Sequence, residues 1–156
     1  MSQKLKEKSL SPEVQAAAVG TRVSPGSIEL SEFDDRVRRA LNAAAEKKAI
    51  EPTVLDLRGI SSFTDFFVIF TGANRRQVQA ITDEVVDQSK RHGNPAARVE
   101  GYQNAEWVLI DYGDFVVHVF DDKARRFYDL ERLWRESRRR DLSADDLTKI
   151  SSLRAE

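Results

Sequence analysis

The chain has 156 residues, of which 40% are apolar and 33% are charged, so its length and composition suit one folded domain with polar tails. The formal net charge of −1 argues against a general electrostatic attraction to nucleic acid or to a membrane surface. Cysteine is absent, which excludes disulfide bonds and thiolate zinc sites.

The sequence lacks the patterns of a secretory signal and of a membrane-spanning helix. The first ten residues are basic, but the apolar run of a signal peptide does not follow them. No apolar run approaches the ~20 residues that cross a bilayer. We therefore expect a cytoplasmic protein without a membrane partner.

Residues 1–30 are predicted to form a flexible N-terminal extension. Its one regular pattern is a short helical stretch at 12–19, which begins with proline at the position that proline favours in helices. Glycine, serine and proline at 20–27 then interrupt any regular structure.

Apolar spacing and breaker residues predict a series of helices and strands after this extension. In chain order we expect a helix at 32–48, strands at 53–58 and 66–72, a helix at 75–91, a strand at 97–101, two strands within 107–120, and a helical segment at 123–134. Ser31, with Asp34 three residues later, resembles a capping box for the first helix. Asn74 is the expected N-cap of the second helix, with Gln77 as its reciprocal partner.

The segment 107–120 is predicted to be a β-hairpin, because Gly113 and Asp114 form a two-residue loop of the kind that suits a type II′ turn. That loop fixes the register, so that opposed residues share a face. One face is continuously apolar and is predicted to be core: Val108, Ile110, Tyr112, Phe115, Val117 and Val119. The other face is mixed: Trp107, Leu109, Asp111, Val116, His118 and Phe120.

The element order predicts an α/β (α+β) fold, a single domain with a mixed sheet of about five strands packed with helices. The strand at 66–72 is expected to run parallel to that at 97–101 through a right-handed helical crossover. Residues 135–156 are predicted to be a polar C-terminal extension, with a short helix after Ser143.

The sequence offers two candidate catalytic sites, which we weigh against a role in recognition. Asp111 and His118 lie diagonally on the mixed face, where such a pair could orient a general base, but no nucleophile or metal-ligand spacing accompanies them, even with Asp65 included. The stretch "TGANRRQV" at 71–78 could hold a phosphate at a helix N-terminus. It matches no known phosphate-loop motif, and the paired carboxylates that a nucleotidyltransferase needs are missing.

Charge is distributed unevenly along the chain. Residues 51–134 carry ten basic and fourteen acidic side chains, whereas residues 131–140 carry five arginines and two glutamates. An acidic region with Trp107, Tyr112, Tyr128 and Trp134 nearby suits a basic protein partner better than a nucleic acid, although these aromatic residues could instead pack in the core. The mixed face is therefore interpreted as a recognition surface.

Five segments in one order resemble the Iojap family, the ribosomal silencing factors, over about residues 34–134. They are "SSFTDFFVI" at 61–69, "TG" followed by Arg76 and Val78, "RVEG" at 98–101, "WVLIDYGDFVVHVF" at 107–120, and "RRFYDLERLW" at 125–134. One departure is "GANR" at 72–75, which replaces a Gly-Thr-Ser-type run. The resemblance assigns residues 31–134 to this domain.

The resemblance implies a small domain distantly similar to nucleotidyltransferases but without their catalytic residues, so no enzymatic activity, cofactor or metal is expected. It implies binding to the large ribosomal subunit at its fourteenth universal ribosomal protein. The bound factor would sterically block joining of the small subunit and so repress translation, and it could assist large-subunit biogenesis. The alternative is a nucleotide-binding or nucleotidyltransferase-like enzyme that uses Asp111, His118 and the Gly72 turn.

The family motifs also carry site residues onto this sequence. Residues expected to contact the ribosomal protein are Trp107, Asp111, Asp114, His118, Tyr128, Leu130, Glu131 and Trp134. Six further positions match the motifs, with either a structural or a contact role open: Asp65, Gly72, Arg76, Glu100, Gly101 and Gly113. Ribosomal RNA contacts are expected of Arg138, Arg139 and Arg140. A homodimer of the free protein is a further alternative, because an apolar edge hairpin can pair with itself.

Overall fold

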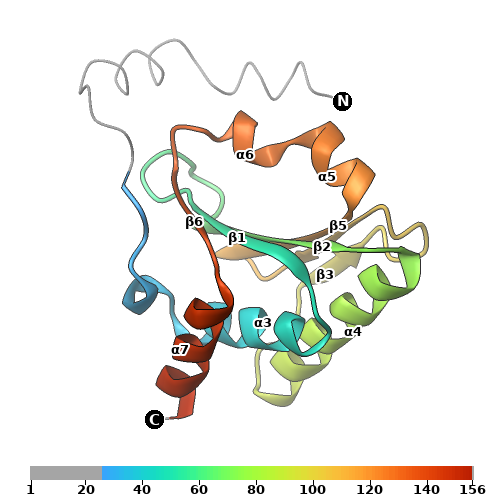
Figure 1. The fold of residues 1–156 in the computed structure, drawn as a ribbon, viewed down its shortest axis with the longest axis horizontal. Coiled ribbons are helices and arrows are strands. Elements are labelled where there is room, and N and C mark those ends of the chain that lie inside the picture. Colours follow the sequence, from blue (N-terminus) through green and yellow to red (C-terminus); the bar gives the residue numbers. More distant parts are fainter. Residues whose placement is uncertain (1–25, 156) are drawn as a thin grey trace.

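The computed structural model of the protein describes residues 26–155, so the short helix predicted at 12–19 lies outside the described residues. A six-stranded mixed sheet forms the centre, with α3, α4 and α7 on one face and α5 and α6 on the other (Figure 1). The strands are β1 (Ile50–Asp56), β2 (Phe66–Gly72), β3 (Arg98–Glu100), β4 (Trp107–Asp111), β5 (Phe115–Asp121) and β6 (Arg138–Asp141). The helices are η1 (Leu30–Glu32), α3 (Asp35–Glu46), α4 (Arg75–Arg91), α5 (Asp122–Tyr128), α6 (Leu130–Leu133) and α7 (Ala144–Ala155).

The spatial order of the strands is β3-β4-β5-β2-β1-β6, and the single parallel pair is β2 with β5. The predicted parallel pairing of 66–72 with 97–101 is therefore wrong, since β3 pairs antiparallel with β4 at the edge of the sheet. The burial of the strands explains why β2 pairs in parallel with β5 and not with β3. Strands β2 and β5 are buried along almost their whole length, as central parallel strands are, whereas all three residues of β3 are exposed.

The sheet has six strands rather than about five, because residues 138–141 of the predicted C-terminal extension form β6 beside β1. A run of three arginines does not look like a strand by composition. Its side chains nevertheless alternate between half-buried and exposed, as edge-strand residues do. The predicted helix after Ser143 is present as α7, which packs against α3 and buries Ile150 completely.

The hairpin has the predicted register. Asp111 lies opposite Val116, and Trp107 lies opposite Phe120. Gly113 has φ 91°, and the Tyr112 N–H donates to the Phe115 carbonyl oxygen at 3.0 Å to close the turn. The face predicted to be core packs under α3 and α4 as part of the larger hydrophobic cluster.

Helix capping agrees with the prediction at one helix and differs at the other. The Asn74 side chain accepts from the Gln77 N–H at 2.8 Å, and the Gln77 side chain accepts in turn from the Ala73 N–H at 2.5 Å. Helix α3 is capped by Asp34 instead of Ser31. Ser31 belongs to the short 3₁₀ turn that precedes the helix, which moves the helix start beyond its reach.

Gly101 allows β4 to approach the loop that follows β3. Its φ is +85°, and a Cβ atom built there would lie 2.2 Å from the carbonyl oxygen of Trp107. Any other residue would meet both a left-handed backbone and a backbone atom that cannot move away. Gly101, one of the family-motif positions, thus has a structural role in setting where β4 begins.

The variant Gly101→Ala should lower the free energy of unfolding by about 3 kcal/mol or more, because the backbone penalty and the clash add. Gly93→Ala is the matched control, since Gly93 has φ +82° but open space around its Cβ position. Urea denaturation would compare the two variants. Equal losses would contradict the close contact between Gly101 and Trp107.

Candidate functional site

The second face of the sheet carries a row of aromatic side chains from three neighbouring strands. Trp107 of β4 lies beside His118 of β5, and the Trp107 Nε1–H donates to His118 Nδ1 at 3.0 Å. The ring of Phe67, from β2, lies 4.4 Å from the His118 ring, measured between centroids. The strand order brings these residues together, because β4, β5 and β2 are adjacent and alternate side chains share a face.

Helices α5 and α6 extend this row beyond the sheet. The Tyr128 ring lies 4.5 Å from that of Trp107, and the Trp134 ring lies 6.0 Å from that of Phe67. Leu130, the first residue of α6, is buried. We call the connected set the aromatic face: Phe63, Phe67, Trp107, His118, Phe120, Phe127, Tyr128 and Trp134.

Two members of the aromatic face are mostly exposed. Phe63, in the loop before β2, is 62% exposed, and Phe127 of α5 is 68% exposed. Each ring contacts a neighbour on the aromatic face, at 6.3 Å for Phe63 with Trp134 and 5.0 Å for Phe127 with Tyr128. Sequence reasoning did not select either residue as a site. The resemblance segments contain both, but a phenylalanine beside a predicted strand or helix is equally typical of core.

Asp111 and His118 do not form the pair that a general base would need. Asp111 Oδ2 accepts from the Arg98 Nε–H at 3.3 Å, and its Oδ1 accepts from the Gly113 N–H at 2.8 Å. His118 is buried and contacts Trp107 and Phe67. Asp111 is therefore turned toward the hairpin and β3, and the geometry favours recognition over acid–base chemistry.

Asp114 and Asp65 lie away from the aromatic face. The Asp114 carboxylate is paired with Arg36, which extends from α3 on the opposite side of the sheet. The Asp114 carbonyl oxygen accepts from the Asp65 N–H at 2.8 Å, and the Asp65 carbonyl accepts from the Leu57 N–H at 2.7 Å. These contacts fix the hairpin tip and the loop before β2.

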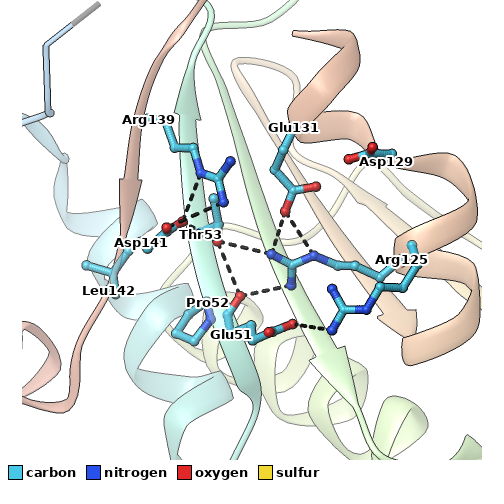
Figure 2. A pocket seen from close by; sticks show the side chains of 10 residues that line it. Glu51, Pro52, Thr53, Arg125, Asp129, Glu131, Arg139, Asp141 and Leu142 are labelled. Atoms are coloured by element: carbon cyan, nitrogen blue, oxygen red, sulfur yellow. Dashed lines mark hydrogen bonds and ion pairs between the residues drawn. The ribbon is translucent and has the colours of Figure 1, made fainter. Parts of the chain in front are cut away.

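Glu131, expected to contact the partner, points into the protein (Figure 2). Its carboxylate is 10% exposed and pairs at 2.6 Å with Arg125, which is 5% exposed. Arg125 also donates to Thr71 Oγ1 at 2.9 Å and to Thr53 Oγ1 at 3.0 Å. Glu131 thus connects α6 with α5 and the sheet.

A pocket of about 400 Å³ lies beside this ion pair (Figure 2). Its charged lining consists of Arg125, Arg126, Arg139, Glu51, Asp129, Glu131 and Asp141. Four carboxylates among three arginines do not make the positive cradle that a nucleotide phosphate requires. The pocket therefore gives no support to the enzyme alternative.

The turn between β2 and α4 also has ordinary structural reasons. A Cβ atom on Gly72 would lie 2.8 Å from the backbone nitrogen of Val78, so glycine permits the helix to pack closely. Side chains at the turn already accept from the Ala73 and Gln77 N–H groups. Arg76 is exposed at the start of α4.

The remaining motif residue, Glu100, forms an exposed ion pair with Arg98 of the same strand at 3.0 Å. Such a pair contributes little to stability.

The three arginines of β6 have different surroundings. Arg138 pairs with Glu32 at 2.5 Å and with Asp56 at 2.6 Å. Arg140 donates to the Ile28 carbonyl oxygen at 2.9 Å and pairs with Asp146 of α7 at 2.8 Å. Arg139 is 48% exposed and pairs with Asp141. Arg138 and Arg140 thus connect chain segments, and Arg139 is the most exposed of the three.

Comparison with known proteins identifies the family. Residues 30–156 match the family model described as "Ribosomal silencing factor during starvation". The chain belongs to the ribosomal silencing factor family. A ribosomal silencing factor of Halalkalibacterium halodurans is 47% identical over 95 residues, which cover 61% of this chain and 81% of that relative. A crystal structure of a Bacillus halodurans protein shares 43% identity with a TM-score of 0.61, over 68% of this chain and 96% of that one.

A more distant relative is named for large-subunit assembly. The mouse protein "Mitochondrial assembly of ribosomal large subunit protein 1" is 27% identical over 128 residues, which cover 79% of this chain and 55% of the relative. Family membership supports a role in ribosome-associated regulation of translation. Within residues 26–155, no helix has the length and apolarity needed to span a membrane.

The ion pairs of Glu32 predict an acid-sensitive contact between η1 and β6. The hydrogen bond from Arg138 is the main cause that lowers the pKa of Glu32 from 4.5 to about 2. Because the folded pKa is lower than the unfolded pKa, the contact stabilises the fold fully above about pH 4.5 and is lost as the pH falls toward 2. Glu32→Gln should therefore lose less stability than the wild-type protein between pH 5 and pH 2.5, as measured by urea denaturation at each pH. Parallel stability curves for the two proteins would contradict this contribution.

Proposed function

We propose that this ribosomal silencing factor binds the large ribosomal subunit through its aromatic face, at the fourteenth universal ribosomal protein. In this position it would sterically block joining of the small subunit and repress translation. The observation that carries the proposal is the exposure of Phe63 and Phe127 at the margins of an aromatic row whose centre is buried. Large exposed aromatic side chains are typical anchors of protein interfaces.

The aromatic face suits binding because its rings already support one another. Trp107 contacts His118, Phe120 and Tyr128, with centroids between 4.5 and 5.9 Å apart. Side chains held in this way lose little conformational freedom when a partner covers them. Much of the aromatic area can therefore contribute to affinity.

The proposed binding depends more on apolar contact than on charge. The region 51–134 is acidic overall, but α5 and α6 also expose Lys123, Arg126 and Arg132 beside the aromatic face. The charge around the aromatic face is thus mixed, so binding to the ribosomal protein should depend only moderately on salt. For a contact with ribosomal RNA we propose Arg139, the most exposed arginine of β6.

The relatives support the large subunit as the target. The mouse relative is named for assembly of that subunit, which fits an additional role in large-subunit biogenesis. A self-associating aromatic face would instead give a homodimer, and light scattering over a range of concentrations distinguishes the two. A dimer that dissociates when large subunits are added would agree with the proposal.

Replacing Phe127 or Phe63 by alanine should weaken binding to purified large subunits by about 2 kcal/mol each, because each ring is an exposed anchor. Val99→Ala is the matched control, since Val99 is 38% exposed but pairs with Ile110, on the opposite face of the sheet. Co-sedimentation with large subunits gives the affinities. Trp107→Ala should cost a similar amount, provided that its folding is confirmed, because Trp107 also bonds to His118.

The blocking activity has its own measurement, the joining of purified subunits followed by light scattering. An excess of the wild-type protein should reduce the formation of joined ribosomes, and Phe127→Ala should reduce it less. Unchanged joining with excess wild-type protein would refute the proposed function.

A further inference from the structure

We infer that Arg125 and Glu131 are positioning residues for the aromatic face, an inference that rests on the proposed function. Their buried ion pair fixes the corner between α5 and α6 against the sheet. The corner displays Phe127, Tyr128 and Trp134. Glu131 thus acts from the interior, whereas its place in the sequence suggested a partner contact.

Arg125 has hydrogen-bond acceptors around its whole guanidinium group. Its Nε–H and one Nη2–H donate to the same Glu131 oxygen, at 3.0 and 2.6 Å. Its other Nη2–H donates to Thr53 Oγ1 at 3.0 Å, and its Nη1 donates to Thr71 Oγ1 at 2.9 Å and to the Glu51 carbonyl oxygen at 2.8 Å. An arginine has five N–H donors, so all of them are satisfied in one geometry.

These acceptors come from separate elements of the fold (Figure 2). Glu51 and Thr53 belong to β1, and Thr71 belongs to β2. The pairing of β1 with β2 is irregular between Ile50 and Thr53, and Glu51 has φ 50° within this bulge. A bulged residue leaves the regular ladder, which frees the Glu51 carbonyl oxygen for Arg125.

The two helices of the corner have little stability of their own. Helix α5 has seven residues and α6 has four, and helices this short are not stable by themselves in water. A single left-handed residue, Asp129, joins them with φ 47° and ψ 59°. Ala124, Leu130, Leu133 and Trp134 pack in the apolar cluster beneath the corner, but apolar packing permits several neighbouring arrangements. The directional bonds of Arg125 select one orientation of the two helices among them.

The decisive variant replaces both partners, Arg125→Met with Glu131→Leu. An apolar pair of similar volume often keeps or increases stability, because it removes the cost of burying charge, but it has no directional bonds. We expect the double variant to unfold at a urea concentration at or above that of the wild-type protein. Amide hydrogen exchange over residues 127–134 should nevertheless accelerate by about tenfold or more, while exchange in β2 and β5 stays unchanged.

Binding separates positioning from stability. In co-sedimentation with large subunits, the double variant should bind about tenfold more weakly although it is equally stable. The single variant Arg125→Lys, which keeps the charge but loses the planar fork, should show a smaller change in the same direction. Arg126→Met is the matched control for the exchange measurement in the same helix, since the ion pairs of Arg126 with Glu51 and Asp122 are exposed, and it should leave exchange over residues 127–134 unchanged.

The outcomes distinguish this inference from the proposed function. Unchanged exchange over 127–134 in the double variant would overturn the positioning role, whatever the ribosome result. Accelerated exchange with wild-type affinity would overturn the link between the corner and binding. If the wild-type protein itself does not bind large subunits, the proposed function fails, and the exchange data still report whether the ion pair fixes the corner.

Discussion

The parallel pairing of β2 with β5 is the constraint on which the rest of the fold depends. Both strands are almost wholly buried, so each face of the sheet centre needs a covering layer. On one face α3, α4 and α7 supply a complete layer over the larger hydrophobic cluster. On the other face, within residues 26–155, the covering helices are α5 and α6, which together have eleven residues. Their small size leaves aromatic rings at the edges of this second layer partly open to solvent.

The aromatic face follows from this imbalance. Phe67 and His118 are buried beneath this layer and Trp107 is partly buried, whereas Phe63 and Phe127 lie exposed at the margins where the layer ends. A protein partner placed there would complete the second layer and remove the exposed rings from water. The surface thus has a physical reason to bind that does not depend on a net charge. This differs from the sequence interpretation, which relied on the acidity of residues 51–134 as a whole.

Local rules made part of this structure predictable. The two-residue turn at Gly113 fixed the hairpin register, and the caps and breakers of 75–91 fixed the limits of α4. Long-range pairing was not predictable in the same way, because strands β2 and β3 carry no local mark of their partners. The arginine run of β6 joins the sheet with Glu32, Asp56 and Asp146 as its ion-pair partners, and Glu32 and Asp56 lie far away in sequence. The interior position of Glu131 was not predictable for a different reason, since its contact with Arg125 depends on the left-handed turn at Asp129 between two short helices.

A buried ion pair in this corner has a cost that an apolar pair would avoid, so its presence calls for a reason other than stability. Apolar side chains can pack in several neighbouring arrangements with similar energy, whereas Arg125 satisfies its five donors in a single one. A surface made of short helices needs such a directional contact if its rings are to stay in one arrangement before the partner arrives. Preorganised rings lose less conformational entropy on binding. The affinity would then depend on the ion pair of Arg125 with Glu131, although neither residue contacts the partner. On the proposed function, the ion pair of Arg125 with Glu131 would thus serve recognition from within the protein, through side chains that are 5% and 10% exposed.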